Sequence, residues 1–299
     1  MNDGVCAVVV TYHPSQVDID NLAFIREQVQ HLVVVDNGSD ENQLTNIRLA
    51  CQAPNIHLIE NGANLGIAAA LNTGIQWAIS QGCKWVVLFD QDSKPSGGFV
   101  ETLLSSLLNH PQTQRIAIMV SSSVDARSNL VSKPPAVFYT PDGELLVAQT
   151  SGSLMPTSVF QKEGWFDEKF FVDYVDYDYC LMVRIHGWII EKCTDAVLLH
   201  KPGDPGDYRV FGVRLFGTTN YSAARRYYRT RNVLWMLRKY WKTNLRLCLT
   251  MNWWNLKDVV KIAGEVNPWN KWRAAFRGFV DGFFRNPGDT PNATRAVQN

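Results

Sequence analysis

The feature of this chain that most restricts its fold is a series of short apolar runs that each end in polar residues. Gly4–Tyr12 reads GVCAVVVTY, His31–Asp36 reads HLVVVD, and Trp85–Phe89 reads WVVLF. Valine-rich runs of this kind are typical of strands buried on both faces of a parallel sheet. Segments with helical spacing separate them, so the pattern predicts an α/β fold, with a mostly parallel Rossmann-like sheet flanked by helices.

The same patterning places further elements along the chain. We expect helices at 18–30, 66–80, 98–109 and 176–186, and strands at 56–60, 116–121, 150–155 and 188–200. Loops and short antiparallel strands are expected at 122–150, and a turn or short helix at 156–164. We therefore divide the chain into a main domain at 1–224, with halves of about 1–121 and 122–224, a helical extension at 225–286 and a flexible tail at 287–299.

Composition limits the setting in which such a chain works. The 299 residues are 46% hydrophobic, enough for one large domain and an appendage. The six cysteines lie far apart and form no CxxC pair, which argues against a zinc site and a disulfide-built fold. The sequence shows neither a signal peptide nor a window of 18 uncharged apolar residues, so we expect a cytoplasmic protein.

Charge is distributed unevenly between the main domain and the extension. Residues 225–285 hold 14 Lys/Arg and 3 Asp/Glu, whereas residues 1–224 hold 14 and 24. The extension also carries an apolar stripe at helical spacing, formed by Trp269, Trp272, Phe276, Phe279 and Phe283. A basic, aromatic segment predicts a negatively charged partner, and an anionic membrane surface fits this pattern. A helical cap on the main domain and an oligomer interface are the alternatives.

Polar residues follow three of the predicted strands where each strand ends. Thr11, Asp36 and the motif Asp90-Gln91-Asp92 all stand at such ends. In open α/β sheets ligands bind beyond the carboxyl ends of the strands, so we expect these groups to share one edge. Paired carboxylates are hard oxygen ligands that suit Mg²⁺ or Mn²⁺, and such ions commonly bridge to phosphates. A simple loop cap is the alternative for the acidic pair.

Later segments supply candidates for catalysis and for a further metal ligand. Asp173, Asp176 and Asp178 crowd together among aromatic residues, where a carboxylate can act as a general base or can cap the following helix. His200 ends an apolar strand and is either a structural histidine or the missing metal ligand. The segment 225–232, RRYYRTRN, is dense in guanidinium donors that match phosphate, or it forms a solvated basic face.

Taken together, these pieces resemble family 2 glycosyltransferases of the GT-A fold, and most of all bacterial rhamnosyltransferases that build cell-surface polysaccharides. The resemblance covers about residues 4–240 and rests on the order and spacing of its motifs. The matching pieces are Thr11–Pro14 (TYHP), Val35–Ser39 (VDNGS), Asn64–Ala68 (NLGIA), Asn72–Gly74 (NTG), Phe89–Ser93 (FDQDS), Thr150–Gly152 (TSG), Phe166–Glu168 (FDE), Phe171–Asp178 (FVDYVDYD), His200 and Arg226–Asn232.

The resemblance implies a role for each matching residue. Asp176 would be the general base, with Asp173 as its rival, and Asp92 and His200 would bind the metal. Donor contacts would come from Thr11, Tyr12, Pro14, Asp36, Asn37, Asn64, Gly66, Asn72, Asp90 and Gln91. Arg226, Tyr228 and Arg231 would bind the diphosphate, and Ser151, Gly152, Trp165 and Asp173 would contact the acceptor.

The activity implied is inverting transfer of a sugar, most directly L-rhamnose from dTDP-rhamnose, with Mg²⁺ or Mn²⁺ as cofactor. The acceptor would be a saccharide, expected to be lipid-linked, in O-antigen, lipopolysaccharide or a related polysaccharide, at the inner face of the cytoplasmic membrane. A galactofuranosyl or hexosyl transferase of the same fold and a non-catalytic nucleotide-sugar-binding scaffold are the alternatives. We expect no nucleic-acid partner. A homo-oligomer through the C-terminal helices stays open.

Overall fold

The chain forms two compact units in the computed structural model, which describes residues 2–125, 133–200, 206–210 and 213–286. The first unit comprises the described residues up to Glu168 and those from Asp176 to the end of the strand at Ile189–His200. The second comprises Lys169–Val175 and the described residues from 206 onward. A short stretch from the middle of the sequence therefore belongs with the C-terminal part.

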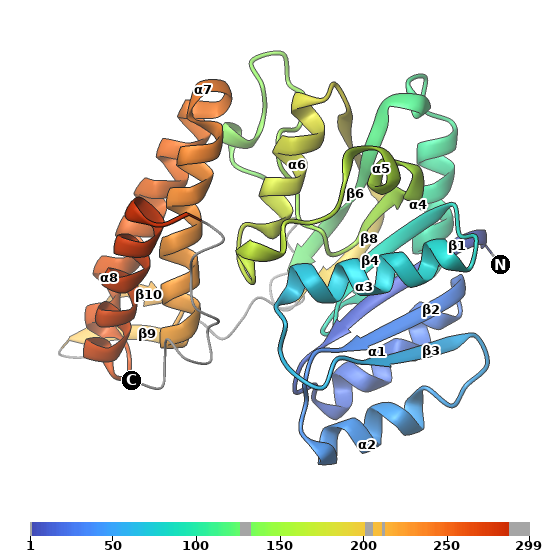
Figure 1. The fold of residues 1–299 in the computed structure, drawn as a ribbon, viewed down its shortest axis with the longest axis horizontal. Coiled ribbons are helices and arrows are strands. Elements are labelled where there is room, and N and C mark those ends of the chain that lie inside the picture. Colours follow the sequence, from blue (N-terminus) through green and yellow to red (C-terminus); the bar gives the residue numbers. More distant parts are fainter. Residues whose placement is uncertain (1, 126–132, 201–205, 211–212, 287–299) are drawn as a thin grey trace. The chain divides into compact units, whose positions relative to one another are not determined.

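Eight strands of the first unit form a single sheet in the order β3-β2-β1-β4-β7-β6-β8-β5 (Figure 1). Neighbouring strands are parallel in the pairs β1–β2, β2–β3, β1–β4 and β6–β8 and antiparallel in the other three. The strands are β1 (Asn2–Thr11), β2 (Val29–Asp36), β3 (Ile56–Glu60), β4 (Trp85–Asp90), β5 (Lys94–Pro95), β6 (Ile116–Asp125), β7 (Ser153–Pro156) and β8 (Ile189–His200).

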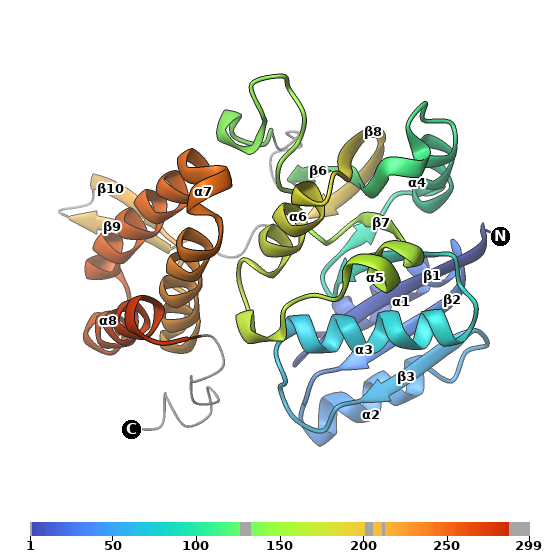
Figure 2. The same cartoon turned by 45° about the horizontal axis from the view of Figure 1, so that its top comes forward.

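Helices cover both faces of this sheet, as Figures 1 and 2 show. Alternate residues of β1 explain the layers: Val5, Ala7 and Val9 join the core with α1, α2 and α4, whereas Val8 lies against Gly74 of α3 on the other face. The helices are α1 (Gln16–Arg26), α2 (Glu41–Ala50), α3 (Ile67–Ser80), α4 (Phe99–Leu108), α5 (Thr157–Glu163) and α6 (Val175–Ile185), with short 3₁₀ turns at Thr113–Arg115, Ala136–Phe138 and Glu168–Phe170.

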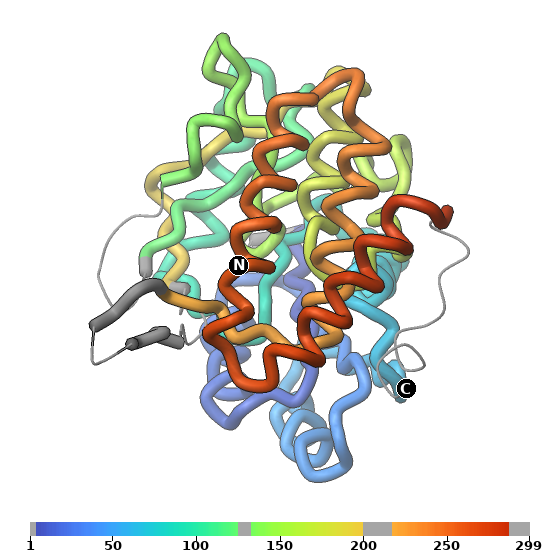
Figure 3. The backbone as a smooth tube through the Cα atoms, turned by 90° about the vertical axis from the view of Figure 1, so that its left-hand side faces the viewer, coloured from blue at the N-terminus to red at the C-terminus, as the bar shows by residue number. Residues whose placement is uncertain are grey.

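The second unit contains the strands β9 (Gly206–Val210) and β10 (Val213–Thr218), the helices α7 (Ala223–Lys261) and α8 (Pro268–Phe284), and a 3₁₀ turn at Ile262–Gly264. Asn244 leaves helical geometry inside α7, with φ −137° and ψ 43°. The chain reverses there, because Asn252 donates to the Val233 carbonyl at 3.2 Å and Asn255 to Thr230 at 3.4 Å. The two arms of α7 are thus antiparallel, and α8 packs beside them (Figure 3).

The face that α8 turns toward α7 is made of small residues. A Cβ at Gly282 would lie 2.8 Å from the carbonyl oxygen of Arg231, and one at Gly278 would overlap the carbonyl oxygen of Tyr227. Only glycine permits so close an approach of two helix backbones. Four of the five aromatic residues of the stripe face away from this contact: Trp269, Phe276, Phe279 and Phe283 are 47–78% exposed. Trp272 is half-buried and donates to the Val259 carbonyl of α7 at 2.9 Å.

The predicted fold class is confirmed, with helix α2 and the strands β5, β9 and β10 as elements that we did not predict. Every strand and helix that we placed within the first 200 residues exists, with ends that shift by a few residues. Residues 133–150 are mostly loop, with one bridge between Tyr139 and Leu145. The tail expected at 287–299 lies outside the described residues. None of the described helices is long and apolar enough to span a membrane.

Candidate functional site

The polar strand ends meet at one edge of the sheet, as the sequence predicted. In the parallel ladders of β1, Thr11 stands opposite Asp36 of β2 and Val10 stands opposite Asp90 of β4. The antiparallel pairs of β7 with β4 and with β6 make β6 and β8 run in the same direction as β4. With β3, which is parallel to β2, the carboxyl ends of six strands therefore share this edge, which is where a parallel sheet places a ligand.

Asp36 organises the loop that follows β2. Its side chain is 1% exposed and accepts hydrogen bonds from the Thr11 hydroxyl at 3.2 Å, the Gly38 and Ser39 amides at 3.1 and 2.9 Å, and the Ser39 hydroxyl at 2.5 Å. A buried carboxylate needs such donors because it has left water. The contact of Asp36 with the nucleotide-sugar donor stays a prediction, and it requires one of these hydrogen bonds to break.

Three asparagines join the loop after β2 to the loop before α3. The Asn37 amide donates to the Asn64 side-chain oxygen at 3.1 Å and accepts from Asn61 at 3.1 Å and from the Leu65 amide at 3.1 Å. Asn64 also accepts from the Gly66 amide at 3.0 Å. Asn37, Asn64 and Gly66, which we predicted to contact the nucleotide-sugar, thus join these two loops through hydrogen bonds. Their contact with a donor stays a prediction.

The loop after β1 is tied to the acidic motif. The Tyr12 amide donates to the side-chain oxygen of Gln91 at 2.8 Å. The Tyr12 side chain is 45% exposed, and Pro14 beside it is buried. Gln91 therefore links the ends of β1 and β4, and the ring of Tyr12 is left open to a ligand.

Ser151 and Gly152 support the acidic motif from beneath. The Asp90 amide donates to the Ser151 hydroxyl at 3.1 Å, and the hydroxyl groups of Ser151 and Ser93 lie 2.8 Å apart. Gly152 donates to the Leu88 carbonyl at 2.7 Å with φ +74°, and a Cβ there would overlap the Ser121 hydroxyl. Both residues thus hold the turn of Asp90. The acceptor contact that we predicted for them stays a prediction.

The chemistry of the acidic motif suits a divalent metal. Within the described part of the chain, no hydrogen bond or ion pair engages the half-buried carboxylate of Asp92. Lys94 of β5 pairs with Leu199 of β8, so one further step along the two strands brings the chain to Ser93 and His200. The backbone thus places residues 92 and 200 close together, although the side chain of His200 lies outside the described residues. Among the described residues no three His, Cys, Asp or Glu side chains gather as a metal site.

Asn72 and Trp165 hold a loop of the first unit. The Asn72 side chain is 3% exposed; it accepts from the Phe166 amide at 3.1 Å and donates to the Phe166 carbonyl and to Glu168, both at 3.0 Å. Both ends of this amide are engaged within the protein, and the sugar-donor contact of Asn72 stays a prediction. Trp165 stacks on Phe160 at 5.9 Å and is 37% exposed, which leaves it open to an acceptor.

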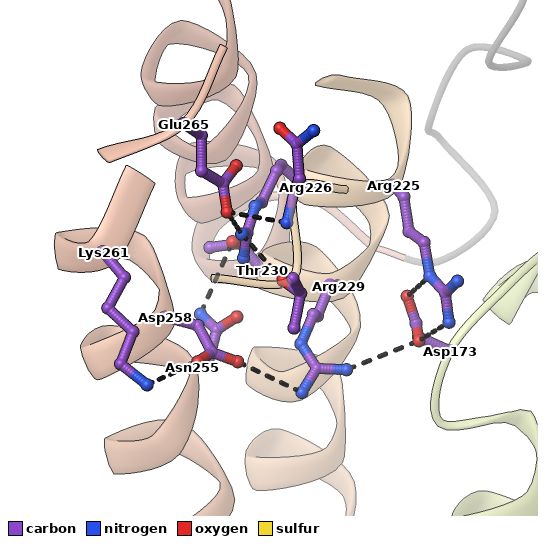
Figure 4. Close-up of polar contacts among 11 residues, drawn as sticks. Asp173, Arg225, Arg226, Arg229, Thr230, Asn255, Asp258, Lys261 and Glu265 are labelled. Carbon is purple, nitrogen blue, oxygen red and sulfur yellow. Dashed lines mark hydrogen bonds and ion pairs between the residues drawn. The ribbon is translucent and has the colours of Figure 1, made fainter. Parts of the chain in front are cut away.

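The two candidate bases have different surroundings. Asp176 lies in the first turn of α6, is half-buried, and accepts from the Tyr177 amide at 2.9 Å. Asp173 belongs to the second unit, where Arg225 donates to both of its oxygens at 3.0 and 3.1 Å and Arg229 donates at 3.4 Å (Figure 4). Asp178 is 3% exposed. The carboxylate of Asp173 is thus already occupied by cations.

The residues predicted to bind diphosphate are buried in the second unit. Arg226 is 2% exposed and pairs with Glu265, which also accepts from Lys271 at 3.0 Å. Arg231 is also 2% exposed, and desolvation lowers its pKa from the ordinary value. Tyr228, equally buried, stacks on Phe171 at 4.5 Å. Buried groups of this kind meet a diphosphate only if the bundle opens. Their contact with the diphosphate stays a prediction.

Several residues of the site escaped the sequence reasoning. Ser93, Asn61 and Ser39 hold loops at the sheet edge, and Arg225 holds Asp173. Ser39 and Ser93 were within the quoted motifs, so their position next to an acidic residue was the available signal. No sequence signal distinguishes Arg225, whose guanidinium points outward, from its buried neighbour Arg226.

Comparison with known proteins identifies the family of this chain. Residues 6–162 match the model of glycosyl transferase family 2. The dTDP-rhamnosyl transferase RfbF of Shigella flexneri is 30% identical over 253 residues, which cover 80% of this chain and 81% of that protein. The low-salt glycan biosynthesis hexosyltransferase Agl10 of Haloferax volcanii is 26% identical over 220 residues, covering 67% and 68%.

Solved structures show the same fold at low sequence identity. Mannosyltransferase PcManGT from Pyrobaculum calidifontis, in complex with GDP-Man and Mn²⁺, is similar with a TM-score of 0.58 and 16% identity, over 94% of this chain and 87% of that one. S. aureus TarS 1-349 has a TM-score of 0.57 and 11% identity, over 93% and 80%. The sheet, its ligand edge and these likenesses lead to one conclusion: the chain belongs to glycosyl transferase family 2, as a rhamnosyltransferase-like member with the GT-A fold.

Proposed function

We propose that this chain is an inverting, metal-dependent transferase that moves L-rhamnose from a dTDP-rhamnose-like donor to a saccharide acceptor. The observation that carries the proposal is the shared strand edge, where Thr11, Asp36 and Asp90 stand in register. The likeness to dTDP-rhamnosyl transferase RfbF supports the choice of sugar and nucleotide. In this proposal residues 1–121 hold the donor and residues 122–224 hold the acceptor.

The transfer step is assigned to Asp176. Its carboxylate accepts the proton of an acceptor hydroxyl, the hydroxyl oxygen attacks the anomeric carbon, and the bond from that carbon to the diphosphate oxygen breaks. Attack from the face opposite the leaving group inverts the configuration. We favour Asp176 over Asp173 because Arg225 and Arg229 already occupy Asp173. Asp92 and His200 would hold Mg²⁺ or Mn²⁺, which neutralises the charge of the leaving diphosphate when bound.

Replacing the proposed base tests this assignment. Asp176→Asn should lower transfer by several orders of magnitude while dTDP binding stays within about twofold, since general bases contribute roughly 10²–10⁴-fold. Asp142→Asn, on an exposed loop, is the matched control. Product formation from dTDP-rhamnose and a panel of acceptors measures the rate, and calorimetry measures binding. Near-normal turnover of Asp176→Asn would reject the assignment.

A second pair of variants tests the metal ligand. Asp92→Ala should remove the dependence of dTDP binding on Mn²⁺, whereas Asp20→Ala, an exposed carboxylate of α1, should leave it unchanged. Titration calorimetry with and without Mn²⁺ separates the two. Unchanged metal dependence in Asp92→Ala would remove Asp92 from the site.

The alternative within the family is transfer of another hexose, which the similarity to hexosyltransferase Agl10 favours. A panel of nucleotide-sugars decides between the two, because the preferred donor gives the highest kcat/KM. If no donor on the panel yields product while dTDP still binds, the chain is a nucleotide-sugar-binding scaffold.

We further propose that the C-terminal helices rest on an anionic membrane surface, where a lipid-linked acceptor would be available. The exposed stripe of α8 is one part of this surface, and the second arm of α7 exposes another at helical spacing: Leu245, Leu249, Trp253, Leu256 and Val260, each 49–66% exposed. Exposed cations, among them Arg246, Lys257 and Arg273, accompany the stripes. Apolar stripes beside basic residues match an interfacial helix better than a neutral protein partner.

Vesicle binding tests this surface. The protein should sediment with vesicles of phosphatidylglycerol and phosphatidylcholine at low salt, and much less with pure phosphatidylcholine. Trp269→Ser combined with Phe276→Ser should weaken binding, whereas Leu49→Ser, at an exposed position of α2, should not. A dimer in light scattering that the stripe variant dissolves, without vesicle binding by the native chain, would instead make the stripes an oligomer interface.

A further inference from the structure

The segment Lys169–Val175 adopts a backbone that its own sequence disfavours. Phe171, Asp173 and Tyr174 have φ of +59°, +60° and +66°, and none of them is glycine. L-residues with side chains rarely adopt this region, so such a conformation persists only where other groups impose it. The segment ends at Val175, the first residue of α6, and Asp176 follows directly in the chain.

One buried amide of α7 supplies that constraint. Asn232 is 0% exposed, and its side-chain NH₂ lies 2.6, 2.8 and 3.0 Å from the carbonyl oxygens of Phe170, Val172 and Asp173. Its side-chain oxygen accepts from the Arg231 guanidinium at 2.8 and 3.0 Å. This acceptor role fixes the orientation of the amide, because only the NH₂ group is then left to face the three carbonyls.

Other residues of α7 hold the same segment from its sides. Arg231 donates to the Lys169 carbonyl at 2.7 Å, and its guanidinium lies 4.0 Å from the Trp235 ring centroid. On the solvent side, Arg225 and Arg229 hold the Asp173 carboxylate, as Figure 4 shows. The segment is thus bound through both its backbone and its side chains by one helix.

We infer that Asn232 is a positioning residue, which fixes the strained segment before α6 and thereby the placement of Asp176. This inference rests on the proposed role of Asp176 as general base. A base must hold its carboxylate within hydrogen-bond reach of the acceptor hydroxyl, and a misplacement of about 1 Å can cost on the order of 100-fold in rate.

The variant Asn232→Asp removes the donor and adds a negative charge at the same place, as Asn252→Asp also does at its own position. The new carboxylate has the same shape and still accepts from Arg231, but it turns an oxygen toward three carbonyl oxygens. We expect kcat to fall on the order of 100-fold while dTDP affinity changes less than about twofold. Asn252→Asp is the matched control, since Asn252 also lies on α7 and donates to two carbonyls, of Val233 and Cys248, away from the segment.

A double-mutant cycle with Asp176→Asn tests the route of the effect. If Asn232 acts through Asp176, Asn232→Asp should cause no further loss in the Asp176→Asn background. Independent multiplicative losses would overturn the inference, and so would a fall in kcat of less than threefold for Asn232→Asp. Full activity of Asp176→Asn alone would reject the proposed base, and with it the catalytic role of Asn232, whatever Asn232→Asp does.

Hydrogen exchange measures how firmly α7 holds the segment Lys169–Val175, and it does so without an activity assay. Amides of residues 170–174 should exchange faster in Asn232→Asp and not in Asn252→Asp, and unchanged exchange would overturn the inference. Arg225→Gln is a second variant in case the first does not fold, because the Arg225 side chain is 44% exposed. It should raise the exchange rate in the same segment and lower kcat by a smaller factor. No change in either quantity would count against the inference that α7 positions this segment.

Discussion

Substitution of Gly278 by alanine examines how α8 packs in the second unit. Helix propensity alone would make this change favourable by about 0.8–1.0 kcal/mol, because glycine loses more conformational entropy than alanine when the helix forms. The structure predicts the opposite sign. An added Cβ would overlap the carbonyl oxygen of Tyr227 and lie 3.1 Å from its carbonyl carbon and 3.2 Å from the Arg231 amide nitrogen.

The size of the destabilisation depends on which atoms the added Cβ would meet. All three neighbours belong to the backbone of α7, which cannot rotate aside as a side chain could. Overpacking of a tight contact costs typically 1–3 kcal/mol, and a backbone obstacle belongs at or above the upper end. After subtraction of the gain in propensity, we expect Gly278→Ala to lower the free energy of unfolding by roughly 2 kcal/mol or more.

Urea unfolding followed by circular dichroism measures this change. Phe276→Ala on the same helix is the control, since its side chain is 68% exposed and its loss should alter stability by less than about 0.5 kcal/mol. The reasoning fails if Gly278→Ala is neutral or stabilising, or if Phe276→Ala is the more damaging change. Either result would mean that α8 turns its aromatic stripe, and not its glycines, toward α7.

Two further changes test contacts of the first unit. Ser151→Ala removes the hydroxyl that receives the Asp90 amide, and loss of one hydrogen bond should weaken dTDP binding by up to roughly tenfold in calorimetry; an effect on acceptor KM alone would restore the predicted acceptor role. The hydrogen bond from Trp188 lowers the pKa of Glu163 below 4.5, with help from His186. The stabilisation is therefore present above pH 4.5 and is lost as pH falls through the lowered pKa, so Glu163→Gln should flatten the urea midpoint between pH 7 and pH 3.5.

The sheet and its ligand edge could be predicted because burial on both faces leaves a strong trace in sequence. β1, β2 and β4 each contain an unbroken apolar run, and the polar residues that follow these runs mark the edge. Helix α2 has no such trace, since Ile47 is its one buried residue among those the structure describes. The sequence also gives no sign of the chain reversal at Asn244, because no proline or glycine lies there.

Periodicity reveals a stripe but not the side on which the stripe lies. The aromatic residues of α8 have the spacing of a packed helix face, yet the packed face carries Ala275, Gly278 and Gly282. The same limit applies to arginine: a guanidinium-rich segment predicts phosphate binding or a solvated face, and the structure buries Arg226 and Arg231. The packed face of α8 depends on how closely two helix backbones approach, and the burial of the arginines depends on a buried partner. Local sequence predicts neither of these.

The residues that the family resemblance assigned to ligands divide according to the state of their polar atoms. Asp36, Asn37 and Ser151 are buried and already hydrogen-bonded to the loops around them, whereas Asp92 keeps a carboxylate that no described group engages. A ligand edge needs both kinds, because loops that carry binding groups must be ordered before the ligand arrives or binding must supply the cost of ordering them. The same logic extends to Asn232, whose amide orders the segment that leads to Asp176.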